Sequence, residues 1–199
     1  MSTPDRLIEA TRELLWERGY VGTSPKAIQQ HAGVGQGSMY HHFPGKSGLA
    51  LAAIRRTADE LRAAADRSLD GPGTAYERIA AYLLREREVL RGCPVGRLTM
   101  DPDVMASDEL RAPVEETIGR LRSRLTEIVR EGVDRGEFDR AVVPGEVAST
   151  IVATVQGGYV LARASGSTAA FDAGVRGLLS LLAPRGAGRC APADATPSV

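Results

Sequence analysis

The sequence predicts an all-α protein, and three observations carry that prediction. Apolar residues recur about every three to four positions through most of the 199-residue chain, as they do on one face of a helix. No segment sustains the alternation of apolar and polar residues, rich in β-branched side chains, that is typical of strands. Prolines and glycines interrupt the helical pattern. We therefore expect about nine helices, of which the first three form a unit at the N-terminal end.

The first helix is expected to begin with Thr3 as its N-cap and to stop at Gly19. Pro4 suits the first helical position because its fixed φ is already that of a helix. Asp5 falls in the first turn, where a carboxylate interacts favourably with the helix dipole. These signals place the start of the first helix at the very beginning of the chain.

Two more short helices are expected, one from Ser24 to Gly33 and one over residues 36–42. Ser24 is a good N-cap, and a glycine between two helices permits a tight turn. In the later helix Met39 and Phe43 are four residues apart, so they share a face and should pack inward. Two short helices joined in this way form the frame of a helix-turn-helix.

Longer helices follow from the same pattern of apolar faces and breaks. Asp70 to Gly73 is a clear break, and Gly92 to Gly96 must be a turn or loop. The expected helices are 46–69, 74–91, a short one near 103–110, 113–135, 144–164 and 168–183. Residues 184–199 hold three prolines and little to bury, so we expect a disordered tail.

Charge is balanced over the whole chain but not along it. Lys plus Arg and Asp plus Glu number 25 each, which gives a formal net charge of zero. From residue 18 to residue 58 there is no acid, and all three histidines lie there. The basic residues of this stretch are Arg18, Lys26, Lys46, Arg55 and Arg56. Phosphate binding needs such a local positive surface, although a solvated face is an alternative reading.

Composition also indicates the cellular compartment. Only two cysteines occur, Cys93 and Cys190, so a disulfide framework is not expected and a reducing cytoplasm suits the chain. The N-terminus leads straight into a charged amphipathic helix, unlike a secretory signal. The apolar stretch 147–162 is too short and too polar to span a membrane. We expect a cytoplasmic protein with no membrane partner.

The third short helix carries groups that can read DNA. A recognition helix enters the major groove led by its N-terminal residues, and Gly35 and Gly37 leave that end unobstructed. Gln36 and Ser38 can hydrogen-bond to base edges, and a glutamine can pair bidentately with adenine. The alternative is a three-helix module that merely packs.

Other groups nearby suit the DNA backbone. Tyr40, His41 and Lys46 can contact phosphates, which sets the register on DNA rather than its sequence. The N-terminus of the second helix offers backbone N–H groups and a lysine to another phosphate. The residues expected to contact DNA are Ser24, Pro25, Lys26, Gln36, Gly37, Ser38, Tyr40, His41 and Lys46.

Over about residues 3–55 the chain resembles the TetR family of bacterial transcriptional regulators. The matching stretches are Glu17 to Tyr20, Ile28 to Val34 and, above all, Gly37 to Lys46. The last reads as the family's glycine, small residue, large apolar residue, Tyr, variable residue, His and Phe, with a Lys opening the next helix. Two positions depart from the pattern: Gly35 replaces the usual Ser or Thr, and Gln36 stands where Lys is frequent.

The resemblance implies a domain order and a mechanism. Residues 1–48 would form the DNA-binding domain and residues 49–183 a domain for ligand binding and dimerisation. The family forms homodimers whose two reading helices meet successive major grooves of a near-palindromic operator. A small-molecule effector shifts the two heads apart and releases the DNA. On this resemblance we expect a repressor rather than an activator.

Two sets of residues are candidates for the dimer interface and the effector site. Small residues in the helix 144–164 permit close approach of a second helix, and the last helix has an apolar stripe. Methionines and aromatic residues make adaptable apolar walls, so the effector is expected to be largely apolar. For each of these residues, a place in the ordinary core is the alternative. The dimer candidates are Ala148, Val152, Val155, Phe171, Val175, Leu178 and Leu182. The effector candidates are Tyr76, Tyr82, Leu83, Met100, Met105, Leu121, Leu125, Gln156 and Tyr159.

Other functions find less support in the residues. Cys93 would be a redox or electrophile sensor if Arg91 and Arg97 lowered its pKa, and an inert residue in a turn otherwise. His41 and His42 are adjacent, which is poor geometry for joint metal ligation, and no phosphate loop or nucleophile elbow occurs. We expect no enzyme, no metal and no cofactor. A helical ligand-binding or interaction protein that does not bind DNA specifically is the remaining alternative.

Overall fold

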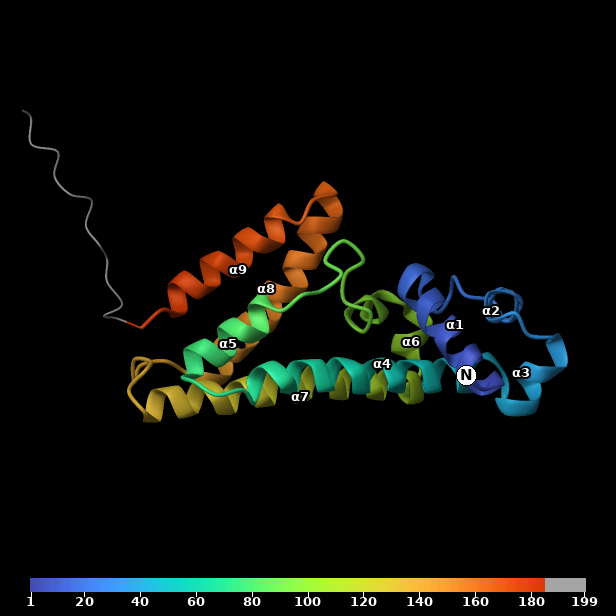
Figure 1. Cartoon of the computed structure of the whole chain (residues 1–199), viewed down its shortest axis with the longest axis horizontal. Coiled ribbons are helices and arrows are strands. Elements are labelled where there is room, and N and C mark those ends of the chain that lie inside the picture. The colour runs from blue at the N-terminus through green and yellow to red at the C-terminus, as the bar shows by residue number, and fades with distance from the viewer. Residues whose placement is uncertain (185–199) are drawn as a thin grey trace, which may run out of the picture.

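The computed structural model describes residues 1–184, apart from the side chain of Gln36. Within this part the chain is all-helical, as predicted, with nine α-helices and one short 3-10 helix, η1 (Figure 1). The elements are α1 (Thr3–Arg18), α2 (Pro25–Ala32), α3 (Gln36–His42), α4 (Gly45–Leu69), α5 (Ala75–Leu84), η1 (Gly96–Met100), α6 (Pro102–Ala106), α7 (Asp108–Asp134), α8 (Pro144–Ser165) and α9 (Ala169–Leu182). The expected tail, 184–199, falls outside the described residues except for Pro184.

The long helices α4 and α7 lie side by side along the length of the molecule (Figure 1). At one end, α1, α2 and α3 pack together around the start of α4. At the other end, α5, α8 and α9 pack on the remaining parts of α4 and α7. No helix of the described residues is long and apolar enough to cross a membrane.

Ser2, and not Thr3, caps α1. The Ser2 hydroxyl accepts a hydrogen bond from the backbone N–H of Asp5, and the Asp5 carboxylate accepts one from the backbone N–H of Ser2. This reciprocal capping box satisfies two N–H groups that a helix start leaves unpaired. Because Ser2 supplies the cap, the helix begins one residue earlier than the sequence prediction. Its end at Gly19, with φ of +75°, is as predicted.

Helix α5 ends at Leu84 instead of continuing to residue 91. The Arg87 guanidinium folds back and donates to the carbonyl oxygens of Tyr82, at 2.6 Å, and Leu83, at 2.7 Å. These carbonyls lie in the last turn of the helix, where no further N–H is present to bond them. The side-chain cap replaces another helical turn, and residues 85–95 form no α-helix.

The prediction of where α7 begins was wrong. The helix begins at Asp108, and the Ser107 hydroxyl accepts from the Leu110 N–H to cap it. Pro113 therefore lies inside the helix, where its missing N–H removes one helical hydrogen bond near the start. The short helix expected over 103–110 is α6, which is only five residues long.

Two clusters of buried apolar residues hold the molecule together. The first combines α1, α2, α3 and the first part of α4 with residues 95–104 and the start of α7. The second combines the end of α4 with α5, α7, α8 and α9. Residues 49–54 of α4 belong to the first cluster, so packing continues across the domain boundary predicted at residue 48.

Candidate DNA-reading face and effector cavity

Helices α2 and α3 meet at a turn that α1 fixes in place. Gly33 has φ of 61° and ψ of 42°, the left-handed conformation that glycine adopts without steric cost. An Arg6 guanidinium nitrogen of α1 donates to the carbonyl oxygens of Ala32, at 2.6 Å, and Gly33, at 2.9 Å. A Cβ at Gly33 would lie only 2.8 Å from the same nitrogen. The turn therefore needs glycine for its backbone conformation, and a Cβ there would also displace the end of the Arg6 side chain.

Helix α3 buries one face and exposes the other. Met39 is fully buried in the first core, and Phe43 packs against that core as predicted. Tyr40, beside Met39 on the helix, is 56% exposed, and His41 and Gly37 are exposed as well. A Cβ built on Gly35 or Gly37 would meet nothing within 4 Å. The N-terminal end of α3 is thus open to an incoming molecule.

The residues predicted to contact DNA at the start of α2 differ in their exposure and in their hydrogen bonds. Pro25 is half-buried at the first helical position. Ser24 is exposed, but its hydroxyl already accepts a hydrogen bond from the Ala27 N–H at 3.1 Å, so it serves as the helix cap. Lys26 is exposed beside this helix end. Ser38 is half-buried at the start of α3.

Lys46 lies against an aromatic ring. Its Nζ is 3.9 Å from the centroid of the Tyr20 ring, and the residue is half-buried. Burial lowers the pKa of Lys46, while the nearby carboxylates of Asp103 and Asp101 act in the opposite direction. The cation is therefore held in a fixed place between α4 and the end of α1.

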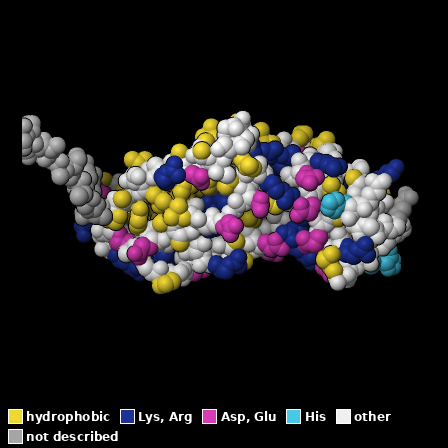
Figure 2. Space-filling model, turned by 45° about the horizontal axis from the view of Figure 1, so that its top comes forward, with side chains coloured by type: hydrophobic (Ala, Val, Ile, Leu, Met, Phe, Trp, Pro, Cys, Tyr) yellow, Lys and Arg dark blue, Asp and Glu magenta, His cyan; other side chains and the backbone are white. Residues whose placement is uncertain are grey.

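The positive surface near α2 and α3 is smaller than the sequence of residues 18–58, which contain no acid, suggested. Arg56 of α4 forms ion pairs with Asp5 at 3.1 Å and Glu9 at 3.2 Å, both on α1. It joins two helices and is not free for phosphate. Figure 2 shows Lys or Arg and His side chains at the end of the molecule formed by α2 and α3, with acidic side chains set back toward the middle.

The segment 91–101 connects this end to the rest of the chain. The Trp16 indole N–H donates to the Gly92 carbonyl oxygen at 3.1 Å, under the Arg91 guanidinium, which lies 3.7 Å from the indole ring. At the other end of the segment, the buried Asp101 accepts from the backbone N–H groups of Tyr20, at 2.7 Å, and Val21, at 3.0 Å. The segment thus contacts both the last turn of α1 and the residues that directly follow this helix.

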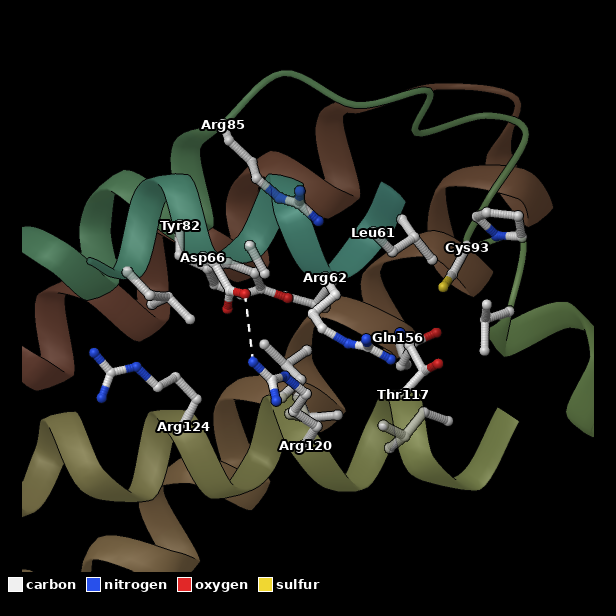
Figure 3. Close-up of a pocket in the computed structure, with 18 of the residues that line it drawn as sticks. Leu61, Arg62, Asp66, Tyr82, Arg85, Cys93, Thr117, Arg120, Arg124 and Gln156 are labelled. Carbon is white, nitrogen blue, oxygen red and sulfur yellow. Dashed lines mark ion pairs between the residues drawn. The ribbon is translucent and has the colours of Figure 1, made fainter. Parts of the chain in front are cut away.

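A narrow cavity of about 70 Å³ lies between α4, α5, α7 and α8 (Figure 3). Cys93, Pro94 and Val95 of the 91–101 segment form part of its wall. The apolar lining comes mainly from residues of the four helices. It comprises Leu61, Ala65, Leu69, Tyr82, Ile118, Leu121, Val152, Val155 and Tyr159.

Four of the nine predicted effector residues line this cavity: Tyr82, Leu121, Gln156 and Tyr159. Burial raises the pKa of Tyr159 to about 12. The other five lie elsewhere. Leu83 and Leu125 are buried in the second core, Tyr76 packs against it, and Met105 is exposed. Met100 is 84% exposed and lines a neighbouring cavity of about 640 Å³, which shares Gln156 and Tyr159 with the first.

The sequence reading missed the charged lining of the cavity. Four arginines and one acid face it: Arg62, Arg85, Arg120, Arg124 and Asp66. Asp66 of α4 and Arg120 of α7 face one another across the cavity at 3.6 Å (Figure 3). An arginine on an amphipathic helix is ordinarily read as part of a solvated face, so periodicity gave no signal for these.

The predicted dimer residues lie within the core of a single chain. Ala148, Val155, Phe171, Val175 and Leu178 are buried in the second core, and Val152 and Leu182 pack against it. They hold α8 and α9 to each other and to α5 and α7. The exposed large apolar side chains of these two helices are others: Val160, Leu161 and Leu181.

Cys93 and the histidines offer no metal site. Among the described residues, no three His, Cys, Asp or Glu side chains are placed to hold a metal ion. Cys93 is half-buried, and its Sγ accepts from the Gly96 N–H at 3.2 Å. Arg91, proposed to activate the thiol, is instead paired with Glu13 at 2.7 Å.

Two family models match the chain. The model described as bacterial regulatory proteins of the tetR family matches residues 7–53. The model described as tetracyclin repressor-like, C-terminal domain, matches residues 74–178. The first covers most of α1, all of α2 and α3 and the start of α4, and the second runs from the cap of α5 into α9.

Relatives of known sequence and structure agree with these matches. The transcriptional regulator LmrA of Bacillus subtilis is 28% identical over 166 residues, which are 79% of this chain and 84% of that protein. The transcriptional repressor AcnR of Corynebacterium glutamicum is 26% identical over 162 residues, 81% and 82% of the two chains. A TetR transcriptional regulator from Chloroflexus aurantiacus has a crystal structure with a TM-score of 0.81 at 28% identity, covering 90% of this chain and 93% of that one.

Proposed function

The chain belongs to the TetR family of DNA-binding transcriptional regulators, and from this premise we propose that it is a repressor released from its operator by a small molecule. It would act in the cytoplasm as a homodimer on a near-palindromic site. The observation that carries the proposal is the exposed outer face of α3, which Met39 and Arg6 hold in a fixed orientation without covering it.

The proposed DNA contacts follow from this geometry. The open N-terminal end of α3 would enter the major groove, where Gln36 and Ser38 read bases. Tyr40 and His41 would contact the backbone from the exposed side of the same helix. Lys26 and Lys46 supply the cations, with further backbone N–H groups at the start of α2.

The proposed dimer uses the outer faces of α8 and α9. Val160 and Leu161 on α8 and Leu181 on α9 are 67%, 56% and 86% exposed. Exposed small residues accompany them: Ala153, Gly157 and Ala164 on α8, and Ala173 and Gly177 on α9. Small residues allow two helices to approach closely, so a second copy is the natural partner for this face.

The proposed effector site is the cavity between α4, α5, α7 and α8. Two of its walls lead directly to the DNA-reading end. Helix α4 runs from the cavity into the first core, and the 91–101 segment runs from Cys93 to Asp101 at the end of α1. A ligand that displaces either wall would move the reading helices.

A salt titration of DNA binding tests the proposal. Affinity for a fragment selected from the source genome should fall as salt rises, with a logarithmic slope of about −0.9 for each neutralised phosphate. Two lysines in each of two heads predict a slope of about −4. Lys26→Gln should reduce the slope by about 2, whereas Arg67→Gln, exposed on α4, should leave it unchanged.

The alternative, a helical ligand-binding protein without specific DNA binding, predicts a different result. Its affinity would be weak for every fragment offered and nearly independent of Lys26. Such an outcome would remove the repressor proposal while leaving the cavity to be explained.

A further inference from the structure

The cavity between α4, α5, α7 and α8 has a surplus of positive charge. Two of its four arginines are compensated. Arg124 pairs with Asp70 at 2.6 Å and Glu127 at 2.9 Å, and Arg120 faces Asp66, the one acid that the described residues contribute to the lining. Among the described residues, Arg62 forms an ion pair only with Asp59, which is mostly exposed, at 3.1 Å. An exposed ion pair of this kind contributes little, because water and salt screen it.

Arg85 is the least compensated of the four. It forms no ion pair with any described residue, and its guanidinium carbon lies 5.1 Å from the Tyr82 ring centroid. The Nε atoms of both Arg85 and Arg62 are buried and have no hydrogen-bond partner among the described residues. A buried donor without a partner destabilises the site, and more so when it belongs to a charged group.

The rest of the lining is apolar. Leu61, Ile118, Leu121 and Tyr159 surround the space that these arginines border. The cavity of about 70 Å³ is small. A cavity of about 150 Å³ holds one benzene molecule, so the enclosed part takes a charged head and a few carbons.

We propose that the effector is a small organic acid, whose carboxylate lies against Arg85, with Arg62 as a further unpartnered donor of the lining, and whose apolar body lies among Leu61, Ile118 and Tyr159. This inference rests on the proposed effector function and names its ligand class. A carboxylate supplies acceptors to guanidinium donors, and its single charge matches Arg85, which pairs with no acid in the described part of the chain. The proposal narrows the largely apolar effector expected from the sequence to an acid with an apolar body.

The test compares acids with neutral compounds of the same shape. Butanoate, hexanoate, octanoate and benzoate, and the primary amide of each, are titrated into the full chain by calorimetry. At least one acid should bind ten times more tightly than its amide. Equal affinity of acids and amides would overturn the proposal, and so would the absence of binding by every acid.

Variants locate the charge that the acid meets. Arg85→Gln should weaken binding of the acid at least tenfold without affecting the amide, and Arg85→Lys should retain part of the affinity. Arg122→Gln, exposed on α7 outside this cavity, removes the same charge and should have no effect. If Arg85→Gln does not fold, Arg62→Gln serves in its place. An undiminished affinity in the folded variant contradicts the assignment.

Two further arms separate the possible explanations. Inorganic phosphate tests for a simple anion site, and its binding as tightly as the best acid would exclude a role for the apolar wall. DNA affinity without any ligand, measured by fluorescence anisotropy, tests the regulator function separately. Intact DNA binding with no preference for acids would thus reject the ligand class alone.

Discussion

Gln36 and Tyr40 have different proposed tasks on the same short helix. Gln36 opens α3, at the end that would enter the groove, and Tyr40 is exposed one turn later. Gln36→Ala should relax base preference at one operator position, at a cost of about 1–3 kcal/mol. Tyr40→Phe should instead weaken binding to all sequences alike. Selection from a randomised operator separates these outcomes, and a base preference altered by Tyr40→Phe would show that its role is misassigned.

Asp101 accepts hydrogen bonds from two separate parts of the chain. One carboxylate oxygen accepts from Tyr20 and Val21, after α1, and the other accepts from Asp103 and Val104 at the start of α6. A Cβ at Gly19 would approach the carboxylate to 2.9 Å. This residue therefore ties the end of α1 to the ligand-binding half.

Replacing Asp101 by Asn should loosen that tie. An asparagine side chain has an NH₂ group in place of one of the two carboxylate oxygens. The two backbone N–H groups that bonded to that oxygen therefore lose their acceptor, at a cost of about 1–3 kcal/mol. Chemical denaturation measures the loss, and Asp103→Asn, exposed on α6, is the matched control. Effector-induced release of DNA should also weaken in this variant. If release is unchanged, the effector acts on the DNA-reading end through α4 alone.

Single residues differ in how far the sequence could predict them. Met39 and Phe43 follow the helical period, and their inward packing was foreseen. The charged lining of the cavity was not, because the position of Arg85 depends on where α5 ends. That end is set by the Arg87 side chain, and the apolar residues Val89 and Leu90 continue the helical pattern beyond it.

At the scale of elements, the packing of α8 against α9 depends on Gly158, which has no side chain. A Cβ at Gly158 would lie 2.7 Å from a ring carbon of Phe171, which is buried and 5.1 Å from the Tyr159 ring, centroid to centroid. The close approach of the two helices therefore depends on this glycine.

Gly158→Ala should destabilise the fold by about 1–3 kcal/mol, because an added methyl group must displace a packed ring. Thermal unfolding measures the change. Gly119→Ala on α7 is the control, since a Cβ there meets nothing within 4 Å. That substitution should be neutral or stabilise by up to about 1 kcal/mol through helix propensity. Equal effects of the two changes would contradict the packing argument.

The sequence predicted the positions of the last two helices better than the surfaces against which they pack. Residues 144–164 and 168–183 were recognised as helices by their apolar periods, but the same period cannot say which apolar face meets its own chain and which meets a second copy. Phe171 and Val175 were assigned to the dimer and lie in the core. The exposed faces are built from small residues, which carry little hydrophobic signal.

At the scale of the whole molecule, a dimer would set the spacing of the two reading heads. Leu161→Glu on the proposed interface should shift the protein to monomers without unfolding it, because it places a charge in a face of small residues. Sedimentation measures the mass. Leu84→Glu, on α5 and similarly exposed at 64%, is the control and should leave the mass unchanged. A dimer that survives Leu161→Glu would move the interface elsewhere.

The two cores show why a domain boundary is hard to read from sequence here. Glycine and proline near residue 45 suggest a division, yet α4 contributes to both cores and residues 95–104 return to the first. The packing of residues 95–104 in the first core depends on tertiary contacts, which local sequence patterns do not indicate. A ligand that moves α4 or α7 therefore acts on both ends of one continuous structure.

The contact between Trp16 and the 91–101 segment has a practical consequence. The chain has a single tryptophan, and its indole donates to Gly92 beneath the Arg91 guanidinium. Fluorescence excited selectively at this indole therefore reports on one junction alone, the place where the cavity wall meets the first helix. The protein carries its own optical probe of communication between its two ends, and emission followed after mixing with a ligand would time that communication without any added label.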